Sequence, residues 1–400
     1  MVMRSFVLSS LLLFTGCGVQ FTPETLINSL RVMAVHAEPP EVAPTETTRL
    51  EVLYSDPSRI GLPNTIIWVG CEPDPLDMNR SACNDASILI KPSLITEYPP
   101  GLTLLGFGPR AMYATKPNPF GMLAPEDPIR KNGSVAVVMS IVVGENVDVS
   151  AMGDELNAVF RRIENKETPA AIALTRVLVS EKTEGRNQNP TISNLTFDGE
   201  NLPIGARLQV NAGQKVTLGV AVPESAREVY FEQQPSGPVE KREVVVGAWY
   251  SIGGRFSQER FDVSASDTTI FTAPGSAEFP EDPVPERRSG QLWLVVRDNR
   301  GAQAWEQFRY WVCDESLPSA TVTGIQAPAS SDDPIVVTGT NMNRALDVVI
   351  GGRALTNGTY SGARDAFVGY LSGLPPGTYP VQLRGQNCVN TDTGLTYTVQ

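Results

Sequence analysis

Apolar and polar residues alternate with a period of two through much of this chain. The first clear cases are residues 30–34 and 50–54, with proline-containing turns at 38–41 and 44–46 between them. Successive side chains of a strand point to opposite faces, so this period predicts antiparallel β-sheet. Residues 134–143 are instead almost continuously apolar, and this predicts a strand that is buried on both faces.

One segment departs from this rhythm and has the period of a helix. Its apolar residues fall at i, i+3, i+4 and i+7, which gives a helix near 154–165 one apolar face: Leu156, Val159, Phe160 and Ile163. The sequence therefore predicts a single short amphipathic helix. Packing over a sheet is the commoner use of such a helix, and docking a partner is the alternative.

Polar and proline-containing stretches divide the strand-rich part into three blocks, 29–186, 189–315 and 318–400. Each block holds several short strands separated by turn residues, and residues 298–301 (Asp-Asn-Arg-Gly) are typical of a hairpin turn. The predicted fold class is mainly β, with tandem immunoglobulin-like β-sandwiches and one helix in the first of them.

The N-terminus has the three parts of a secretory signal. Arg4 supplies a positive charge, residues 6–13 are largely apolar, and small residues precede Cys17. The run Phe14-Thr15-Gly16-Cys17 resembles the lipobox of bacterial lipoproteins. The resemblance implies that residues 1–16 are removed and that Cys17 carries three acyl chains, enough for stable membrane anchoring. Ordinary secretion with cleavage near Cys17 is the alternative.

Residues 17–28 are expected to form a lipidated spacer that lets the first domain stand off the membrane. Gly18 follows the cysteine, and in Gram-negative lipoproteins of this kind the absence of Asp there favours the outer membrane. We therefore expect a lipid-anchored protein of the outer membrane, facing the periplasm or the cell surface.

The net charge of the chain is −12. An acidic surface repels the phosphate backbone of nucleic acids and has no polybasic attraction to anionic lipid. Nucleic acid is therefore excluded as a partner, and the lipid is the expected route of membrane attachment.

Four cysteines remain when Cys17 is set aside, and an even number in an exported chain is typical of disulfides. Three connectivities are open. We favour the local pairing, since Cys71 with Cys83 closes a short polar loop and Cys313 with Cys388 clips the entry of the last domain to its penultimate segment. A zinc site is the competing reading, but no Cys-x-x-Cys is present and the only histidine is distant.

The last block carries a second resemblance. Residues 335–342 (Ile-Val-Val-Thr-Gly-Thr-Asn-Met), 347–352 and 374–383 are similar to strands and turns of TIG (IPT) domains, with Gly339 expected at a tight turn. The resemblance implies an immunoglobulin-like fold for about 80 residues. TIG domains generally serve as spacers or interaction modules, so it indicates fold more than function.

Candidate catalytic residues are sparse. His36 is the only imidazole, is expected to face solvent on the first strand, and has no accompanying nucleophile motif such as G-x-S-x-G. We therefore predict that the chain is not an enzyme, with a carbohydrate-active hydrolase using two carboxylates of the second domain as one alternative.

No cofactor is expected beyond the covalent lipid on Cys17. Asp262 with Asp267, and residues 331–333, are weak calcium candidates without the Asp-x-Asp-x-Asp-Gly form.

The predicted function is a lipid-anchored envelope or cell-surface protein that acts as a non-enzymatic interaction or structural module, with an unidentified protein or glycan as partner. A glycan-binding surface lipoprotein is the other alternative. Its candidate contacts are Trp305 and Trp311, which parity places on one face of a strand with Tyr310 on the other.

Overall fold

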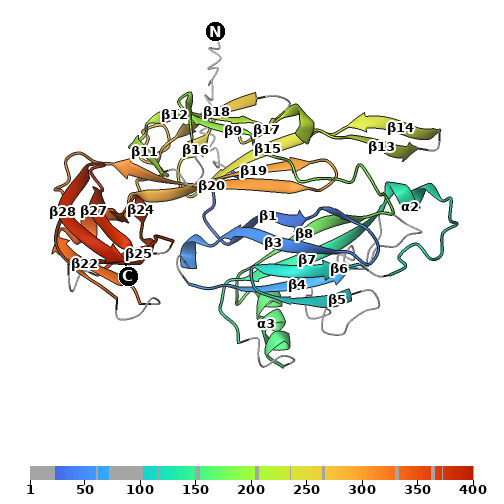
Figure 1. The fold of residues 1–400 in the computed structure, drawn as a ribbon, viewed down its shortest axis with the longest axis horizontal. Helices are drawn as coiled ribbons and strands as arrows, with labels where there is room; N and C mark the ends of the chain where they lie inside the picture. The colour runs from blue at the N-terminus through green and yellow to red at the C-terminus, as the bar shows by residue number, and fades with distance from the viewer. Residues whose placement is uncertain are drawn as a thin grey trace, which may run out of the picture.

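The computed structural model describes residues 23–59, 62–71, 102–115, 117–148, 154–202, 207–234, 236–263, 266–328, 333–361, 365–371 and 373–399. Its strands form three β-sandwiches in chain order, with the second between the first and the third (Figure 1). The predicted mainly β fold of tandem sandwiches is confirmed. The signal segment, Cys17 and Cys83 lie outside the described residues.

The first sandwich pairs a three-stranded sheet, β1-β3-β6, with a five-stranded sheet, β2-β8-β7-β4-β5. Its strands are β1 Arg31–Glu38, β2 Glu41–Val42, β3 Thr47–Ser55, β4 Thr65–Cys71, β5 Leu102–Phe107, β6 Arg110–Ala114, β7 Ser134–Val143 and β8 Ala170–Val179. Its helices are the 3-10 turn η1 Pro57–Arg59, α2 Pro128–Asn132 and α3 Asp154–Glu164.

Strand β7 is buried on both faces, as its continuous apolar run predicts. Val138 and Val142 point into the core between the two sheets, whereas Met139 and Ile141 point to the opposite face. Helix α3 covers that second face with Leu156, Val159 and Phe160. The predicted helix is confirmed, and its apolar face packs inside the domain, so the partner-docking alternative is wrong.

Helix α2 was not predicted from the sequence. Asp127 caps it by accepting a hydrogen bond from the amide of Ile129 at 2.9 Å, and Pro128 occupies its first turn. An Asp-Pro pair is a known start signal for a helix, because proline needs no amide hydrogen bond there. The signal was present, but a helix this short has no apolar period to reveal it.

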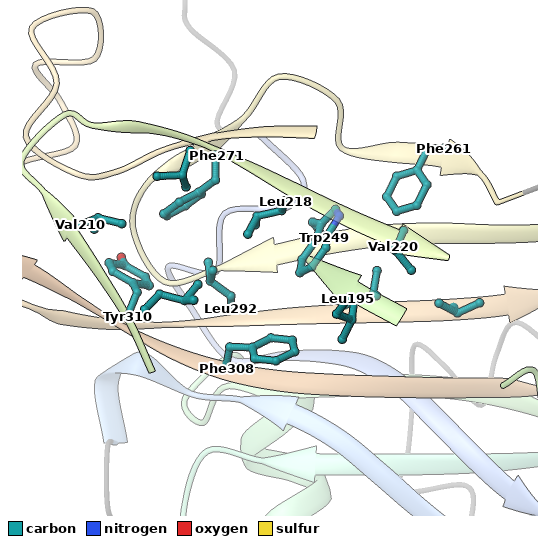
Figure 2. Close-up of a cluster of buried hydrophobic side chains, with 14 of the residues drawn as sticks. Leu195, Val210, Leu218, Val220, Trp249, Phe261, Phe271, Leu292, Phe308 and Tyr310 are labelled. Carbon is teal, nitrogen blue, oxygen red and sulfur yellow. The ribbon is translucent and has the colours of Figure 1, made fainter. Parts of the chain in front are cut away.

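The second sandwich pairs the sheets β10-β9-β12-β18-β16 and β11-β20-β19-β15-β17, and a two-stranded ribbon, β13-β14, projects from it (Figure 1). Its elements are β9 Asn194–Phe197, β10 Glu200–Asn201, β11 Arg207–Asn211, β12 Lys215–Ala221, η5 Glu224–Ala226, β13 Val229–Gln234, β14 Gly237–Arg242, β15 Val245–Ser251, β16 Arg255–Phe256, β17 Arg260–Asp262, β18 Ser266–Thr272, β19 Ser289–Asp298 and β20 Gln303–Cys313. Figure 2 shows its core, where Trp249, Phe271 and Tyr310 lie between the sheets.

The third sandwich pairs β21-β22-β26-β25 with β24-β23-β27-β28. Its elements are β21 Thr321–Gln326, β22 Ile335–Thr340, η6 Met342–Arg344, β23 Ala345–Ile350, β24 Arg353–Ala354, β25 Thr356–Ser361, β26 Ala366–Tyr370, β27 Gly377–Gly385 and β28 Asn390–Val399. Gly339 lies within β22 and not at a turn. A Cβ there would lie 1.8 Å from the carbonyl oxygen of Thr321, so close backbone approach is what requires glycine.

The first two sandwiches share an apolar interface. Met33, Ala34 and Leu53 of the first pack against a patch on the outward face of the second sandwich's sheet: Ala248, Tyr250, Trp293 and Val295. Burial of this patch joins the two domains through a core of their own and leaves little freedom for rotation between them.

A buried ionic network lies at the same junction, centred on Arg300 of the β19–β20 hairpin. Its Nε lies 2.5 Å from Glu243, another nitrogen pairs with Glu228, and Nη1 lies 3.9 Å from Glu41 of the first sandwich. Glu41 also accepts hydrogen bonds from the Ser180 hydroxyl at 2.5 Å and from a backbone amide. Glu41 and Glu243 are both 1% exposed, so the hairpin, the base of the ribbon and the first domain are tied together away from water.

Asp298 in this hairpin makes the junction sensitive to pH. Burial, followed by the nearby charge of Glu243, raises the pKa of Asp298 from 3.8 to about 6, against three backbone amides that donate to its Oδ1. Because the folded-state pKa lies above the unfolded one, the stabilisation gained by protonating Asp298 is full below about pH 4 and is lost as the pH rises through 6.

We expect Asp298→Asn to isolate this contribution, since the amide keeps an acceptor oxygen and never ionises. The unfolding free energy of the variant minus that of the wild type should fall by on the order of 2 kcal/mol between pH 7.5 and pH 4.5. Urea titrations at several pH values measure this difference. A difference that is constant with pH would show that Asp298 does not titrate in this range.

The expected spacer is wrong in its second half, because residues 23–28 pack on the second sandwich. Leu26 forms a parallel bridge with Ser251, and backbone hydrogen bonds of 2.8 and 2.9 Å flank it. Thr25 and Ile27 are 3% and 2% exposed, and Glu24 pairs with Arg260 at 2.7 Å. These residues bury apolar surface and pair with a strand, so they are part of the folded body.

Among the described residues, no helix is both long enough and apolar enough to cross a membrane.

Candidate binding pocket between the second and third sandwiches

Strand β20 carries the outward face on which both neighbours pack. Phe308, Tyr310 and Val312 point into the core of the second sandwich, so Trp305 and Trp311 point outward, as their parity predicts. The two indoles lie at opposite ends of the strand, and each is covered by a different neighbouring domain.

Trp305 lies at the interface with the first sandwich, against His36. The two rings meet edge to face with their centroids 5.6 Å apart, and the Nδ1 of His36 lies 2.6 Å from the carbonyl oxygen of Gln303. The His36 side chain is 20% exposed, so the expectation that it faces solvent holds only in part. The second sandwich covers this position of β1, and contacts between domains cannot be read from the parity of one strand.

Trp311 is 4% exposed, so its indole ring is almost entirely covered. The guanidinium groups of Arg207 and Arg384 lie 5.3 and 6.0 Å from the centroid of its ring. These distances are those of cation–π contacts. Trp311 is the floor on which two arginines from different domains are held.

A disulfide between Cys313 and Cys388 joins the end of β20 to the turn between β27 and β28, with the two Cα atoms 5.3 Å apart. The bond therefore links the second sandwich to the third directly. The amide of Asp314 donates to the carbonyl oxygen of Gln386 at 3.0 Å beside it. Cys71 is also disulfide-bonded, and its pairing with Cys83 stays a prediction, because Cys83 lies outside the described residues.

Two sheet faces meet at this junction and leave a pocket of about 450 Å³ between them. One wall comes from β11 and β20 of the second sandwich, whose parallel register places Arg207 beside Arg309 and Gln209 beside Trp311. The opposite wall comes from the third sandwich, with Val349, Ala354, Arg384 and Asn390 among its lining residues. Cross-strand pairing of Asp347 with Arg384, and of Arg384 with Asn390, puts these side chains on one sheet face.

Positive charge dominates this junction, in a chain whose net charge is −12. Arg207 pairs with Asp347, which is 3% exposed. Burial, followed by the charges of Arg384 and Arg309, lowers the pKa of Arg207 to about 10. Arginine keeps its charge at neutral pH, so the three guanidinium groups place positive charge here that the one carboxylate of Asp347, paired with Arg207, does not balance.

The carboxylates of the second domain were the basis of the hydrolase alternative. Three of them, Glu228, Glu243 and Asp298, do lie together, but around Arg300 in the junction with the first domain. Glu243 and Asp298 are 1% and 8% exposed. This cluster is structural, because neither carboxylate is open to a substrate. Within the described ranges, no group of three or more His, Cys, Asp or Glu residues is arranged to hold a metal ion.

The pocket arginines were missed by sequence reasoning. Arg207 and Gln209 share parity with each other, and Arg309 with Trp311, so each pair is readable as one strand face. The parallel pairing of β11 with β20 and the position of Arg384 depend on contacts between distant segments. Nothing in the local pattern brings the third domain's arginine to Trp311.

No family model matches the chain, and no curated protein matches it in sequence. The solved structures that match the chain include one in complex with a xylogluco-oligosaccharide, at 11% identity and a TM-score of 0.19, covering 93% of this chain and 60% of the other. Another is SGBP-B of a Bacteroides ovatus mixed-linkage glucan utilization locus, with a mixed-linkage heptasaccharide, at 9% identity and a TM-score of 0.17, covering 94% and 66%. The periplasmic chaperone SfaE has 10% identity and a TM-score of 0.24, covering 50% and 96%.

The chain thus spans less than two thirds of the length of the first two structures, 60% and 66%. Identities and TM-scores this low do not assign a function.

Proposed function

We propose that this chain is a lipid-anchored protein of the bacterial envelope that acts as a rigid, non-enzymatic binding module, and that the pocket between the second and third sandwiches is its ligand contact. The observation that carries the proposal is the pocket itself. It is about 450 Å³ in volume, within the range of ligand sites, and polar side chains from two domains converge on it.

The rigidity of the body supports this role. Apolar burial and the Arg300 network hold the first sandwich on the second, and the Cys313–Cys388 disulfide holds the third. Pocket walls that are fixed before binding need little ordering when a ligand arrives. A pre-organised pocket between two clamped domains therefore suits recognition.

The lipid anchor at Cys17 is part of the proposal, and the docked residues 23–28 give it a geometric consequence. From Cys17 to Pro23 an extended chain reaches about 20 Å. The bridge of Leu26 with Ser251 fixes where that tether meets the body. The end of β15 at Ser251 would then lie close to the membrane surface, a short distance from the lipid.

We expect Cys17→Ser to abolish lipid attachment while export and folding continue. Metabolic labelling with an alkyne fatty acid, followed by membrane fractionation, measures this. The wild type should be labelled and sediment with membranes, and the variant should be unlabelled and soluble. Gly18→Ala is the matched control and should behave as the wild type. Equal labelling of Cys17→Ser would remove the anchor from the proposal.

The binding role is tested in living cells with a photo-crosslinking amino acid at Gln209, which is exposed in the pocket. The same amino acid at Glu200 is the control, since Glu200 is exposed on the opposite sheet of the same sandwich. We expect adducts at position 209 and none at position 200. The absence of adducts at both positions would contradict the pocket as a contact.

A further inference from the structure

We propose that the pocket between the second and third sandwiches binds a carboxylate-bearing sugar unit of an acidic polysaccharide, an inference that rests on the binding role proposed above. Arg207 and Arg384 would hold the carboxylate, and Gln209 and Asn390 would pair with the sugar hydroxyls.

The first step is the charge of the site. Arg207 and Arg384 line the pocket, Arg309 lies beside Arg207 in the parallel register, and Asp347 pairs with Arg207. Among the described residues, Arg384 has a cation–π contact with Trp311 and no ion pair. Guanidinium groups repel one another at short range, so an anion that enters the pocket relieves this repulsion.

The second step is the shape of the charged group that fits. A guanidinium presents a planar fork of N–H donors that matches the two oxygens of a carboxylate. Arg207 and Arg384 lie over the same indole ring, from opposite walls of the pocket. A planar carboxylate between the two walls can receive donors from both.

The third step is what surrounds the charge. Gln209 and Asn390 line the pocket with side chains that are exposed, and each amide has both a donor and an acceptor. A hydroxyl also has both, so amides and hydroxyls pair well. A volume of about 450 Å³ accommodates more than a bare ion, and a sugar acid supplies both the carboxylate and the hydroxyls.

Trp311 does not serve as a stacking platform for a neutral sugar. Its ring is 4% exposed, and the two guanidinium groups occupy its surroundings. Its contribution is to hold the arginines in place. This makes the charge of the ligand, and not its apolar ring face, the feature that the site recognises.

The experiment uses the full-length protein in detergent and calorimetric titration at low and moderate salt. The probes are polygalacturonate, dextran of similar length as a neutral glycan, galacturonate monomer and inorganic phosphate. We expect polygalacturonate to bind in a salt-dependent manner and dextran not to bind. Binding of dextran as tight as that of polygalacturonate, or binding of phosphate tighter than that of the sugar acids, would overturn the proposal.

Two variants locate the site. Arg384→Gln should weaken polygalacturonate binding at least about tenfold, the loss expected for a charge-assisted hydrogen bond. Arg353→Gln is the matched control, since Arg353 is exposed on the same sheet but does not line the pocket, and it should bind as the wild type does. Asn390→Ala removes no charge and tests the contact with the sugar hydroxyls separately. It should weaken polygalacturonate binding without changing its salt dependence.

Equal binding by Arg384→Gln and the wild type would contradict the inference. If crosslinks form at Gln209 while no acidic glycan binds, the pocket is a contact for another ligand, and only this inference fails. If no crosslink forms there, the proposed function itself fails.

Discussion

Arg300→Gln is expected to destabilise the junction of the first two sandwiches by about 3–5 kcal/mol, the cost of leaving the buried carboxylate of Glu243 without its cation. Glu41, Glu228 and Glu243 all lie within ion-pair range of this one guanidinium. Glutamine keeps most of the length of the side chain but neutralises none of the three charges. Urea unfolding followed by tryptophan fluorescence measures the loss.

Arg110→Gln is the matched control, because Arg110 pairs with Glu51 at 3.2 Å on the surface, with side chains 64% and 30% exposed. Its loss should stay below about 1 kcal/mol. Burial raises the pKa of Glu228 as well as that of Asp298. The effect of Arg300→Gln should therefore shrink as the pH falls, because protonation of Glu228 removes one of the unpaired charges. Similar small losses for both variants would contradict a buried network.

The paired change Cys313→Ser with Cys388→Ser has the second largest expected effect. The bond closes a loop with a sequence separation of 75. A loop of this length restricts the unfolded chain enough to stabilise the third sandwich by about 4 kcal/mol. Scanning calorimetry of the full chain should show the transition of the third sandwich at a lower temperature.

Reductant provides the control for this prediction, since it should lower that transition in the wild type and leave it unchanged in the double variant. The variant should also bind ligands more weakly at the pocket, because Trp311 lies two residues before Cys313 and Asn390 two residues after Cys388. An unchanged transition in the double variant would show that packing alone holds the third domain.

The local spacing of apolar and polar residues was sufficient to predict most of the secondary structure. The run at 134–143 and the helical spacing from Leu156 to Ile163 each identify their element, because the period of burial is set by the geometry of the strand or helix itself. Elements without such a period were missed, including α2 and strand β14, whose side chains are largely exposed.

The candidate site was only partly predictable, and Trp311 illustrates why. Its parity correctly placed it on the outer face of β20, opposite Tyr310. Whether an outer face meets water or another domain is decided by contacts between segments far apart in the chain. Trp311 meets Arg384 of the third sandwich, and Trp305 meets His36 of the first, and the role of the two indoles as glycan contacts stays a prediction.

The sequence by itself determined the fold class and one amphipathic helix, because these follow from local periodicity. It also raised the expectations of a lipid anchor at Cys17 and of no catalytic set. The tertiary structure decided that residues 23–28 belong to the body, that the outer face of the central sandwich is covered at both ends, and that three arginines converge between two domains. Each of these depends on docking between domains, and docking leaves no periodic signal within any one strand.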